Sequence, residues 1–188
     1  MDETALIELA AQKDEQAWEA LIRAHQPSVF RLAYLFTGDP DDAEDVTQDA
    51  FVRAFRFINH FDRSRSFRPW LLSITANLAR NRLRGFKRYI AALQSSARRD
   101  PDAFLAHDQN LTGSEEAQNL WRVVRKLSHA DQQVIYLRYF LELSEDETAA
   151  ALDVPHGTVK SRLHRALSRL RDRLVEEGNE SFKAVEHE

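Results

Sequence analysis

The sequence predicts an all-α protein in which two small helical domains are joined by a flexible linker. Three observations favour this fold class. Apolar residues recur three or four positions apart along most of the 188-residue chain, which is the spacing of a buried helix face. Residues that begin helices, such as serine or aspartate ahead of an acidic turn, precede several of these runs. Between residues 90 and 114 the periodicity is lost and Ser, Asp, Pro, Asn and Gly accumulate, as they do in linkers.

The first helical pattern covers residues 4–24. Pro27 is expected to end or kink this helix, because proline lacks the backbone N–H that an interior position donates. The pattern resumes at residues 28–36 and should stop at Gly38, since glycine adopts the left-handed conformation that follows many helices. Asp39 and Pro40 then predict a new helix, with a capping aspartate followed by a first-turn proline.

The helix opened by Asp39 should span residues 41–61 and has two apolar faces. Phe51, Val52 and Phe55 lie on one face, beside polar side chains. An exposed aromatic ringed by polar groups marks many protein-binding surfaces, so these residues are candidates for a partner interface. The alternative is that Phe51 and Phe55 simply widen the core face. The polar neighbours are Asp45, Gln48 and Asp49, and the expected core stripe is Ala43, Val46, Ala50, Ala54, Phe57 and Ile58.

Residues 61–67, FDRSRSF, predict a short basic loop between two aromatics, and Pro69 suits the first turn of the next helix. Amides and arginines repeat at helical spacing on one face of that helix. With neighbouring aromatics they suit a surface that grips phosphates and unstacked bases. For Trp70, Phe61 and Phe67 the alternative is packing in the core. The polar face comprises Ser73, Asn77, Arg80, Asn81, Arg84 and Arg88, and the expected core stripe is Trp70, Leu71, Ile74 and Leu78.

Helical spacing returns at residues 115–127. Ser128 and Asp131 predict the cap of a further helix, because a serine hydroxyl can accept the orphan N–H three residues on. These two helices are expected to form the floor for the segment that follows. The acidic residues after Leu174 are expected to fray.

Residues 143–174 predict a helix-turn-helix. Ser144 and Glu147 form a capping-box pattern, and Asp153-Val154-Pro155 should end the first helix at about Leu152. A second helix opens around Pro155, where proline is tolerated. Its basic face could lie in a DNA major groove as a recognition helix. The candidate DNA-binding residues on that face are Thr158, Lys160, Ser161, Arg162, Arg165 and Arg169; the alternative is a solvated helical hairpin.

The net charge of −4 is unevenly distributed. Residues 63–99 contain ten lysines and arginines and no acid, and residues 154–173 contain six against one aspartate. The intervening and terminal segments are acidic. Two separate basic blocks predict two separate contacts with a polyanion.

Composition excludes several function classes. The chain has no cysteine, so disulfides, thiol catalysis and cysteine-ligated metals are excluded. Its five glycines form neither a P-loop nor a dinucleotide fingerprint, and its seven histidines show no paired metal-ligand spacing. We therefore expect no cofactor and no enzymatic activity. An acidic N-terminus and the lack of a long apolar run predict a cytoplasmic protein without membrane insertion.

Three segments together resemble the bacterial sigma-70 family of RNA polymerase sigma factors, in particular its extracytoplasmic-function (ECF) group. They are AEDVTQDAF at 43–51, FRPWLLSITANLARNRLR at 67–84, and LSEDETAAALDVP followed by HGTVKSRLHRALSRLR. The resemblance covers about residues 10–175. It implies a sigma region 2 helical bundle over 1–89, a linker over 90–114 and a region 4 helix-turn-helix over 115–175, followed by an acidic tail over 176–188.

The resemblance also implies roles and partners. Residues on the polar face of the 41–61 helix would bind core RNA polymerase. The loop and helix at 61–84 would melt the promoter's −10 element and hold single-stranded DNA, while the recognition helix would read duplex DNA at −35. An anti-sigma factor is a further expected partner. The implied residues are Asp45, Gln48, Asp49 and Phe51 for polymerase, and Phe61, Arg63, Arg65, Phe67, Asn77, Asn81 and Arg84 for single-stranded DNA.

The chain departs from the family pattern at two site positions. Asp153 stands where many members have glycine; aspartate tolerates the left-handed conformation, so the turn should survive. Asn81 stands where many members have aspartate. Two rival functions are a stand-alone helix-turn-helix regulator of duplex DNA, which leaves the faces at 43–55 and 73–88 unused, and a nucleic-acid enzyme, which lacks metal and nucleophile signatures.

Overall fold

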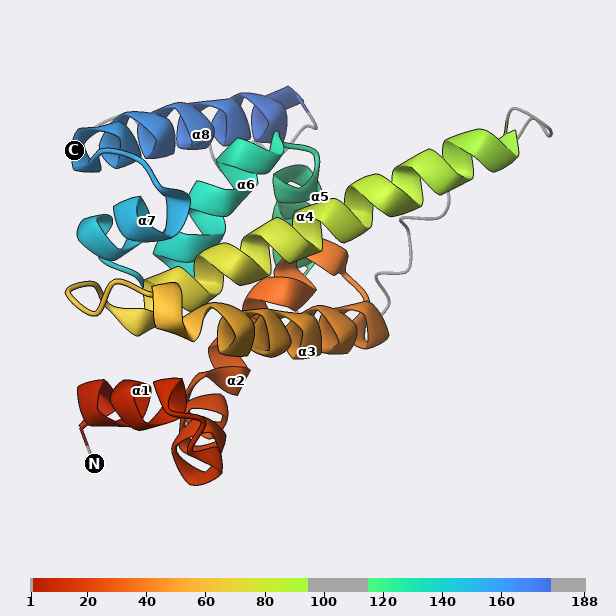
Figure 1. Cartoon of the computed structure of the whole chain (residues 1–188). Helices are drawn as coiled ribbons and strands as arrows, with labels where there is room; N and C mark the ends of the chain where they lie inside the picture. The colour runs from red at the N-terminus through yellow and green to blue at the C-terminus, as the bar shows by residue number, and fades with distance from the viewer. Residues whose placement is uncertain (1, 95–114, 177–188) are drawn as a thin grey trace. The chain divides into compact units, whose positions relative to one another are not determined.

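The computed structural model of the chain describes residues 2–94 and 115–176, with side chains described at 2–85 and 118–176. Within these residues the regular structure is helical throughout, which confirms the predicted all-α fold class (Figure 1). The chain divides into two compact units, Met1–Asp108 and Gln109–Glu188. Most of the predicted linker and of the acidic tail lies outside the described residues.

The first unit is built around one long helix. Its elements are α1 (Glu3–Ala11), α2 (Glu15–Thr37), α3 (Pro40–Phe57), the 3₁₀ turn η1 (Ile58–His60) and α4 (Phe67–Gln94). The central helix is α2, which packs against α1, α3 and α4. Burial of its apolar face therefore holds the unit together. The largest fully buried side chains of the unit are Phe67, Leu21, Leu32, Leu71, Leu72, Val29 and Val46.

The start of the first unit differs from the prediction in two places. The expected helix over residues 4–24 breaks at Lys13, which takes a φ of 68°. Asp14 then caps α2 by accepting a hydrogen bond from the Ala17 N–H at 2.8 Å. At Pro27, where an end or a kink was expected, the helix does not end, because α2 continues to Thr37. One missing hydrogen bond at an exposed position costs less than the burial of Val29 and Leu32 contributes.

The turn between α2 and α3 follows its local sequence signals. Gly38 adopts the left-handed conformation with a φ of 71° and ends α2. The Asp39 carboxylate accepts the Asp42 N–H at 2.9 Å, which caps α3 as predicted. The buried Thr37 hydroxyl lies 3.0 Å from the Ala33 carbonyl and 3.1 Å from that of Asp39. The orientation of α3 is therefore fixed locally.

A buried aromatic cluster joins α1, α2 and α4. His25 of α2 lies with its ring centroid 5.3 Å from that of Phe67, and its Nε2 is 2.9 Å from a Glu3 carboxylate oxygen of α1. Phe67 contacts Phe61 and Trp70 at centroid distances of 5.6 and 5.4 Å. Burial lowers the pKa of His25, and the Glu3 carboxylate only partly opposes this shift. We call His25, Phe61, Phe67 and Trp70 the aromatic cluster.

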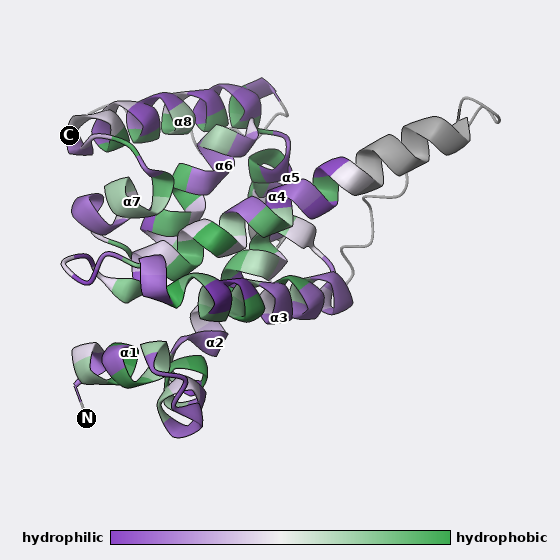
Figure 2. Cartoon of the chain, in the orientation of Figure 1, coloured by the Kyte–Doolittle hydropathy of each residue, from purple (hydrophilic) through white to green (hydrophobic). Residues whose placement is uncertain are grey.

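The second unit contains the predicted helix-turn-helix. Its elements are α5 (Glu115–Arg125), α6 (His129–Ile135), the π-helical turn η3 (Tyr136–Phe140), α7 (Glu145–Leu152) and α8 (His156–Glu176). The helix α8 packs on α5, α6 and α7. Figure 2 shows that hydrophobic residues of α8 lie along its side facing the other helices. The apolar residues buried on that side are Val159, Ala166 and Leu174.

The helix boundaries of the second unit agree with the capping signals. Ser128 accepts the Asp131 N–H at 3.2 Å, and Ser144 and Glu147 form the complete capping box. Asp153 takes the left-handed conformation, with φ and ψ both 52°, so aspartate does serve in this turn. A contact that the sequence did not predict ends α5: the buried Gln132 amide donates to the Arg125 carbonyl at 2.7 Å.

The lowered pKa of His25 predicts acid sensitivity of the first unit. Below about pH 6.5 the unfolded chain binds the proton more readily than the folded chain, so the free energy of unfolding falls as the pH falls. We expect His25→Gln, whose amide can still donate to Glu3 but does not titrate, to lose less stability between pH 7.5 and 5.5. Urea unfolding measured by fluorescence in a Trp121→Phe background would report on Trp18 and Trp70 of this unit. Equal losses in both proteins would contradict the prediction.

Candidate functional site

The exposed face of α3 carries acids, an amide and two apolar side chains. Asp45, Gln48 and Asp49 are exposed, and Val52 and Phe55 are 49% and 41% exposed. These residues lie at helical spacing on one side of α3, within about three turns of one another. We call these five residues the acidic-aromatic surface. Its composition suits a protein partner that brings cations and an apolar pocket.

The aromatic residues of α3 are distributed differently from the expected core stripe. Phe51 is only 7% exposed and packs edge-to-face on Trp18 at a centroid distance of 6.5 Å. Phe57, expected in the core, is instead 46% exposed. The reason is geometric: Phe51 and Phe57 lie about 60° to either side of the buried Ala54, and the core covers only one side. Phe51 therefore supports the acidic-aromatic surface from within.

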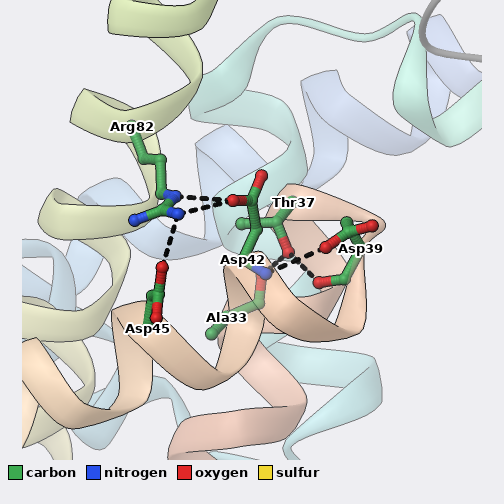
Figure 3. A network of polar contacts seen from close by, with 6 residues as sticks. All are labelled: Ala33, Thr37, Asp39, Asp42, Asp45 and Arg82. Carbon is green, nitrogen blue, oxygen red and sulfur yellow. Dashed lines mark hydrogen bonds and ion pairs between the residues drawn. The ribbon is translucent and has the colours of Figure 1, made fainter.

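An ion-pair network joins α3 to α4 (Figure 3). Arg82 of α4 donates through Nε to Asp42 at 2.7 Å and through Nη2 to Asp45 at 2.6 Å. Partial burial acts to lower the pKa of Arg82, but the two carboxylates outweigh it and raise the pKa. Exposed pairs of this kind stabilise a fold by about 0–1 kcal/mol each, so their main effect is to align the helices. The sequence analysis missed this pairing because Arg82 follows its partners by about forty residues.

The opposite side of α4 carries amides and arginines. Asn77, Asn81 and Arg84 are exposed, whereas Ser73 and Arg80 are half-buried. The Arg80 guanidinium donates to the Asn77 side-chain oxygen, and Ser73 donates to the Trp70 carbonyl at 2.7 Å. The side chain of Arg88 lies outside the described residues. The buried face is also rotated from the expected stripe, because Ile74 and Leu78 are half-buried while the fully buried residues are Leu71, Leu72, Thr75, Ala76 and Ala79.

The loop between α3 and α4 exposes its arginines and buries its aromatics. Phe61 and Phe67 belong to the aromatic cluster and lie in the core, which is the alternative that the sequence left open. Arg63 and Arg65 are exposed between them. Asp62 shapes the turn by accepting the Ser64 hydroxyl and N–H at 2.7 and 3.0 Å, and these hydrogen bonds lower its pKa. The loop thus exposes its arginines to solvent while its two ends are anchored in the core by buried aromatic rings.

The recognition-helix candidates on α8 fall into two groups. Lys160, Ser161 and Arg165 are exposed, and Thr158 and Arg162 are half-buried. Arg169 differs, because its Nη1 donates to both carboxylate oxygens of the buried Asp131 at 2.9 Å.

Asp131 also accepts the Ser128 hydroxyl at 2.7 Å. Arg169 therefore anchors α8 to the start of α6, and this role was not expected from the sequence.

One more polar contact joins the start of α8 to the start of α7. His156 at the start of α8 lies 3.5 and 3.4 Å from carboxylate oxygens of Glu145 and Asp146 at the start of α7. Neither here nor at any other point of the described segments is a trio of histidine, aspartate or glutamate side chains placed to hold a metal ion. Nor does any helix there combine the length and apolarity needed to cross a bilayer.

Sequence comparison identifies the family. Residues 21–89 match Sigma-70 region 2, and residues 117–170 match Sigma-70, region 4. The chain is 32% identical over 170 residues to the ECF RNA polymerase sigma factor SigW of Bacillus subtilis, covering 86% of this chain and 90% of that protein. The chain belongs to the ECF group of the sigma-70 family. The first match spans most of α2, all of α3 and most of α4, and the second runs from the first turn of α5 through most of α8.

Other relatives agree with this assignment. The chain is 34% identical over 170 residues to SigE of Mycolicibacterium smegmatis, covering 90% of this chain and 66% of that protein. It also resembles the solved structure of CnrH in complex with the cytosolic domain of CnrY, with a TM-score of 0.67 and 26% identity over 93% of this chain and 97% of that one. The two-unit helical fold is therefore the fold of ECF sigma factors.

The contact between Arg169 and Asp131 predicts a stability effect in this sigma factor. Arg169→Ala would leave the buried Asp131 carboxylate without its cation, and we expect the free energy of unfolding of the second unit to fall by about 1–2 kcal/mol. Arg165→Ala is the matched control, since Arg165 is exposed and donates only to the Ser161 carbonyl within its own helix. Chemical denaturation followed by Trp121 fluorescence would measure both. Equal effects would show that the ion pair adds nothing.

Proposed function

We propose that this sigma factor binds core RNA polymerase and directs it to promoters by gripping DNA at two points. The observation that carries the proposal is the placement of opposite chemistries on adjoining helices of the first unit. The acidic-aromatic surface lies on α3, and the exposed amides and guanidinium of Asn77, Asn81 and Arg84 lie on α4. A second cationic helix, α8, lies in the other unit. A protein that must hold a protein partner and a polyanion together needs this combination.

Each predicted domain has its own role in this proposal. Residues 1–89 would act as region 2, residues 90–114 as a linker, and residues 115–175 as region 4. Two DNA-binding modules on one chain raise the effective concentration of the second contact once the first has formed. Each small module can then bind weakly by itself while the pair holds the promoter firmly.

At the −35 element, α8 would enter the major groove of duplex DNA. Exposed cations at Lys160 and Arg165 suit phosphates, which fix the position of the helix without reading sequence. Arg162 and Thr158 lie closer to the body of the unit and are candidates for base edges. Arg169 is paired with Asp131. It would therefore contribute to the positive electrostatic potential of this face of α8 and would not read a base.

At the −10 element, α4 and the preceding loop would hold the unpaired strand. Asn77, Asn81 and Arg84 offer amide and guanidinium donors on one exposed face. Extruding a base costs a few kcal/mol in order of magnitude, so contacts made only with the open strand must offset that cost. Melting would then be driven by binding energy and needs no catalytic group. We accordingly propose that the protein has no enzymatic activity of its own and works where the polymerase works, in the cytoplasm.

A regulatory protein partner is part of this proposal. CnrH, which this chain resembles at 26% identity, was solved with the cytosolic domain of CnrY bound. We propose that a protein of this anti-sigma type occupies surfaces of the free sigma factor. Such a partner would compete with polymerase or DNA for these surfaces.

Transcription in vitro tests the function directly. Purified protein is added to core polymerase on a genomic DNA library, and start sites and opened bases are mapped. The proposal expects new start sites that share an upstream duplex element and a downstream opened element. A palindromic duplex footprint without polymerase, and no new start sites with it, would instead support the helix-turn-helix regulator.

The acidic-aromatic surface yields a prediction about polymerase affinity. Gln48→Ala with Asp49→Ala should weaken binding to core polymerase by about tenfold or more, because residues in a desolvated interface each contribute on the order of 1 kcal/mol. Glu15→Ala with Gln16→Ala is the matched control, since it removes the same chemistry from exposed positions of α2. Fluorescence anisotropy of labelled sigma factor measures the affinity. Phe51 is unsuitable as a probe because its truncation would open a cavity in the core.

The recognition helix yields a prediction about promoter choice. Arg162→Ala should reduce discrimination between bases at one position of the upstream element by about 1–3 kcal/mol, as for loss of one bidentate contact. Lys160→Ala should weaken binding to all promoters alike and reduce the salt dependence by about one charge. Competition among promoters substituted at single −35 positions separates the two effects. An unaltered base preference in the Arg162 variant would assign that residue to phosphate.

A further inference from the structure

An exposed aromatic residue at the end of α3 carries no role in the function described so far. Phe57 is 46% exposed, although it lies on a helix whose other side packs in the core. The Arg53 guanidinium carbon lies 5.8 Å from the centroid of the Phe57 ring. The His60 ring lies 6.1 Å from the same centroid, tilted by 57°. Two planar or ring-shaped groups thus flank one apolar ring at the surface.

The position of Phe57 relative to α4 follows from the chain path. Arg82 binds Asp42 and Asp45 in the first turns of α3, whereas the loop after η1 connects the other end of α3 to the first residue of α4. The two helices therefore run antiparallel, as Figure 1 shows. Phe57 lies at the end of α3 that adjoins the basic loop and the first turns of α4, away from the Asp42 and Asp45 end.

The charge around Phe57 is that of a polyanion-binding surface. Arg53 lies against the Phe57 ring, and residues 61–68 contain three arginines and a single acid, Asp62. The Asp62 carboxylate is engaged by Ser64 and lies 3.5 Å from Arg65 Nε. By contrast, the acidic-aromatic surface contains Asp45 and Asp49, about 80° to 120° away around α3. Phe57 therefore belongs with the cations of the loop and not with the protein-binding face.

We propose that Phe57, with Arg53 and His60, forms a stacking platform for one unpaired nucleobase of the opened promoter. This inference rests on the proposed function and extends its single-stranded DNA site from α4 and the loop onto the end of α3. Stacking on an aromatic ring requires only the flat face of a base, so the platform tolerates sequence variation. Arg53 can stack on a base and still reach a phosphate, because its guanidinium is both planar and charged.

The test uses the complete chain assembled with core polymerase on forked promoter DNA derived from a mapped start site. The unpaired strand is made with the base removed at one position at a time, and the affinity of the holoenzyme is measured for each DNA. With the native protein, one abasic position should weaken binding by about tenfold, as for loss of one stacked base. With Phe57→Leu, intact DNA should bind about tenfold more weakly, and removing that same base should cause no further loss.

Two further variants serve as controls. Phe57→Tyr keeps the flat ring and should retain the native profile of abasic sensitivity. Phe30→Leu removes another exposed aromatic of the same unit, one that is 37% exposed and stacked on Tyr34 of its own helix. It should also retain the native profile.

Three results would decide against the platform. An abasic profile in Phe57→Leu identical to that of the native holoenzyme would overturn it. A loss of affinity for core polymerase in Phe57→Leu, with that unchanged profile, would overturn it in favour of a protein contact. Failure of the native holoenzyme to bind forked DNA at all would overturn the proposed function, and the platform with it.

Discussion

The aromatic cluster of His25, Phe61, Phe67 and Trp70 is the interaction on which the first unit's surfaces depend. Phe61 ends the short turn after α3 and Phe67 begins α4, so both ends of the basic loop are held in the same buried site. Their rings meet edge-to-face at 5.6 Å, a favoured geometry for aromatic pairs. Because His25 contacts Phe67 and pairs with Glu3, the cluster also holds α1 against this site. Both ends of the loop that exposes Arg63 and Arg65 are therefore anchored in the core.

The acidic surface of α3 and the cationic surface of α4 can serve two partners at once only if the two helices keep a defined spacing. The network of Arg82 with Asp42 and Asp45 sets this spacing at one end, and the anchored loop sets it at the other. The network also has an electrostatic consequence. Arg82 neutralises part of the negative charge on α3, so the exposed Asp49 and Gln48 remain the more accessible polar groups for a cationic partner. One side chain thus links the proposed polymerase-binding helix to the proposed DNA-binding helix.

Local signals determined what the sequence could predict. The caps at Asp39, Ser128 and Ser144, and the left-handed turn at Asp153, were all foreseen because each depends on residues within three or four positions. Whether the helix would end or only kink at Pro27 was left open, because its continuation to Thr37 depends on burial against α3 and α4.

The sequence could not determine which face of each helix would be buried. Periodicity alone cannot say which side of an apolar-rich helix meets its neighbours. Phe57 was therefore wrongly assigned to the core, and the position of Phe51, which the sequence left open, proved to be buried. The sequence left open whether Phe61 and Phe67 were buried, and the structure places them in the core. Arg169 and Arg82 pair with residues about forty positions away, which no local pattern reveals. The candidate site was thus predictable as a set of polar faces but not as a set of contacts.

The exposed apolar side chains of α3 would become buried if a partner bound to this helix. Val52, Phe55 and Phe57 each leave about half of their surface in water, and each would contribute more to stability if it were covered. Val52 and Phe55 lie on the same face of α3 as Asp45 and Asp49, whereas Phe57 lies against Arg53, so the same partner chemistry does not suit both groups. A cationic protein surface fits the first and a nucleobase with its phosphate fits the second. The two proposed binding tasks would then be separated by angle around the axis of α3, and the buried alanines of α3 let it pack closely on α2, which supports both faces.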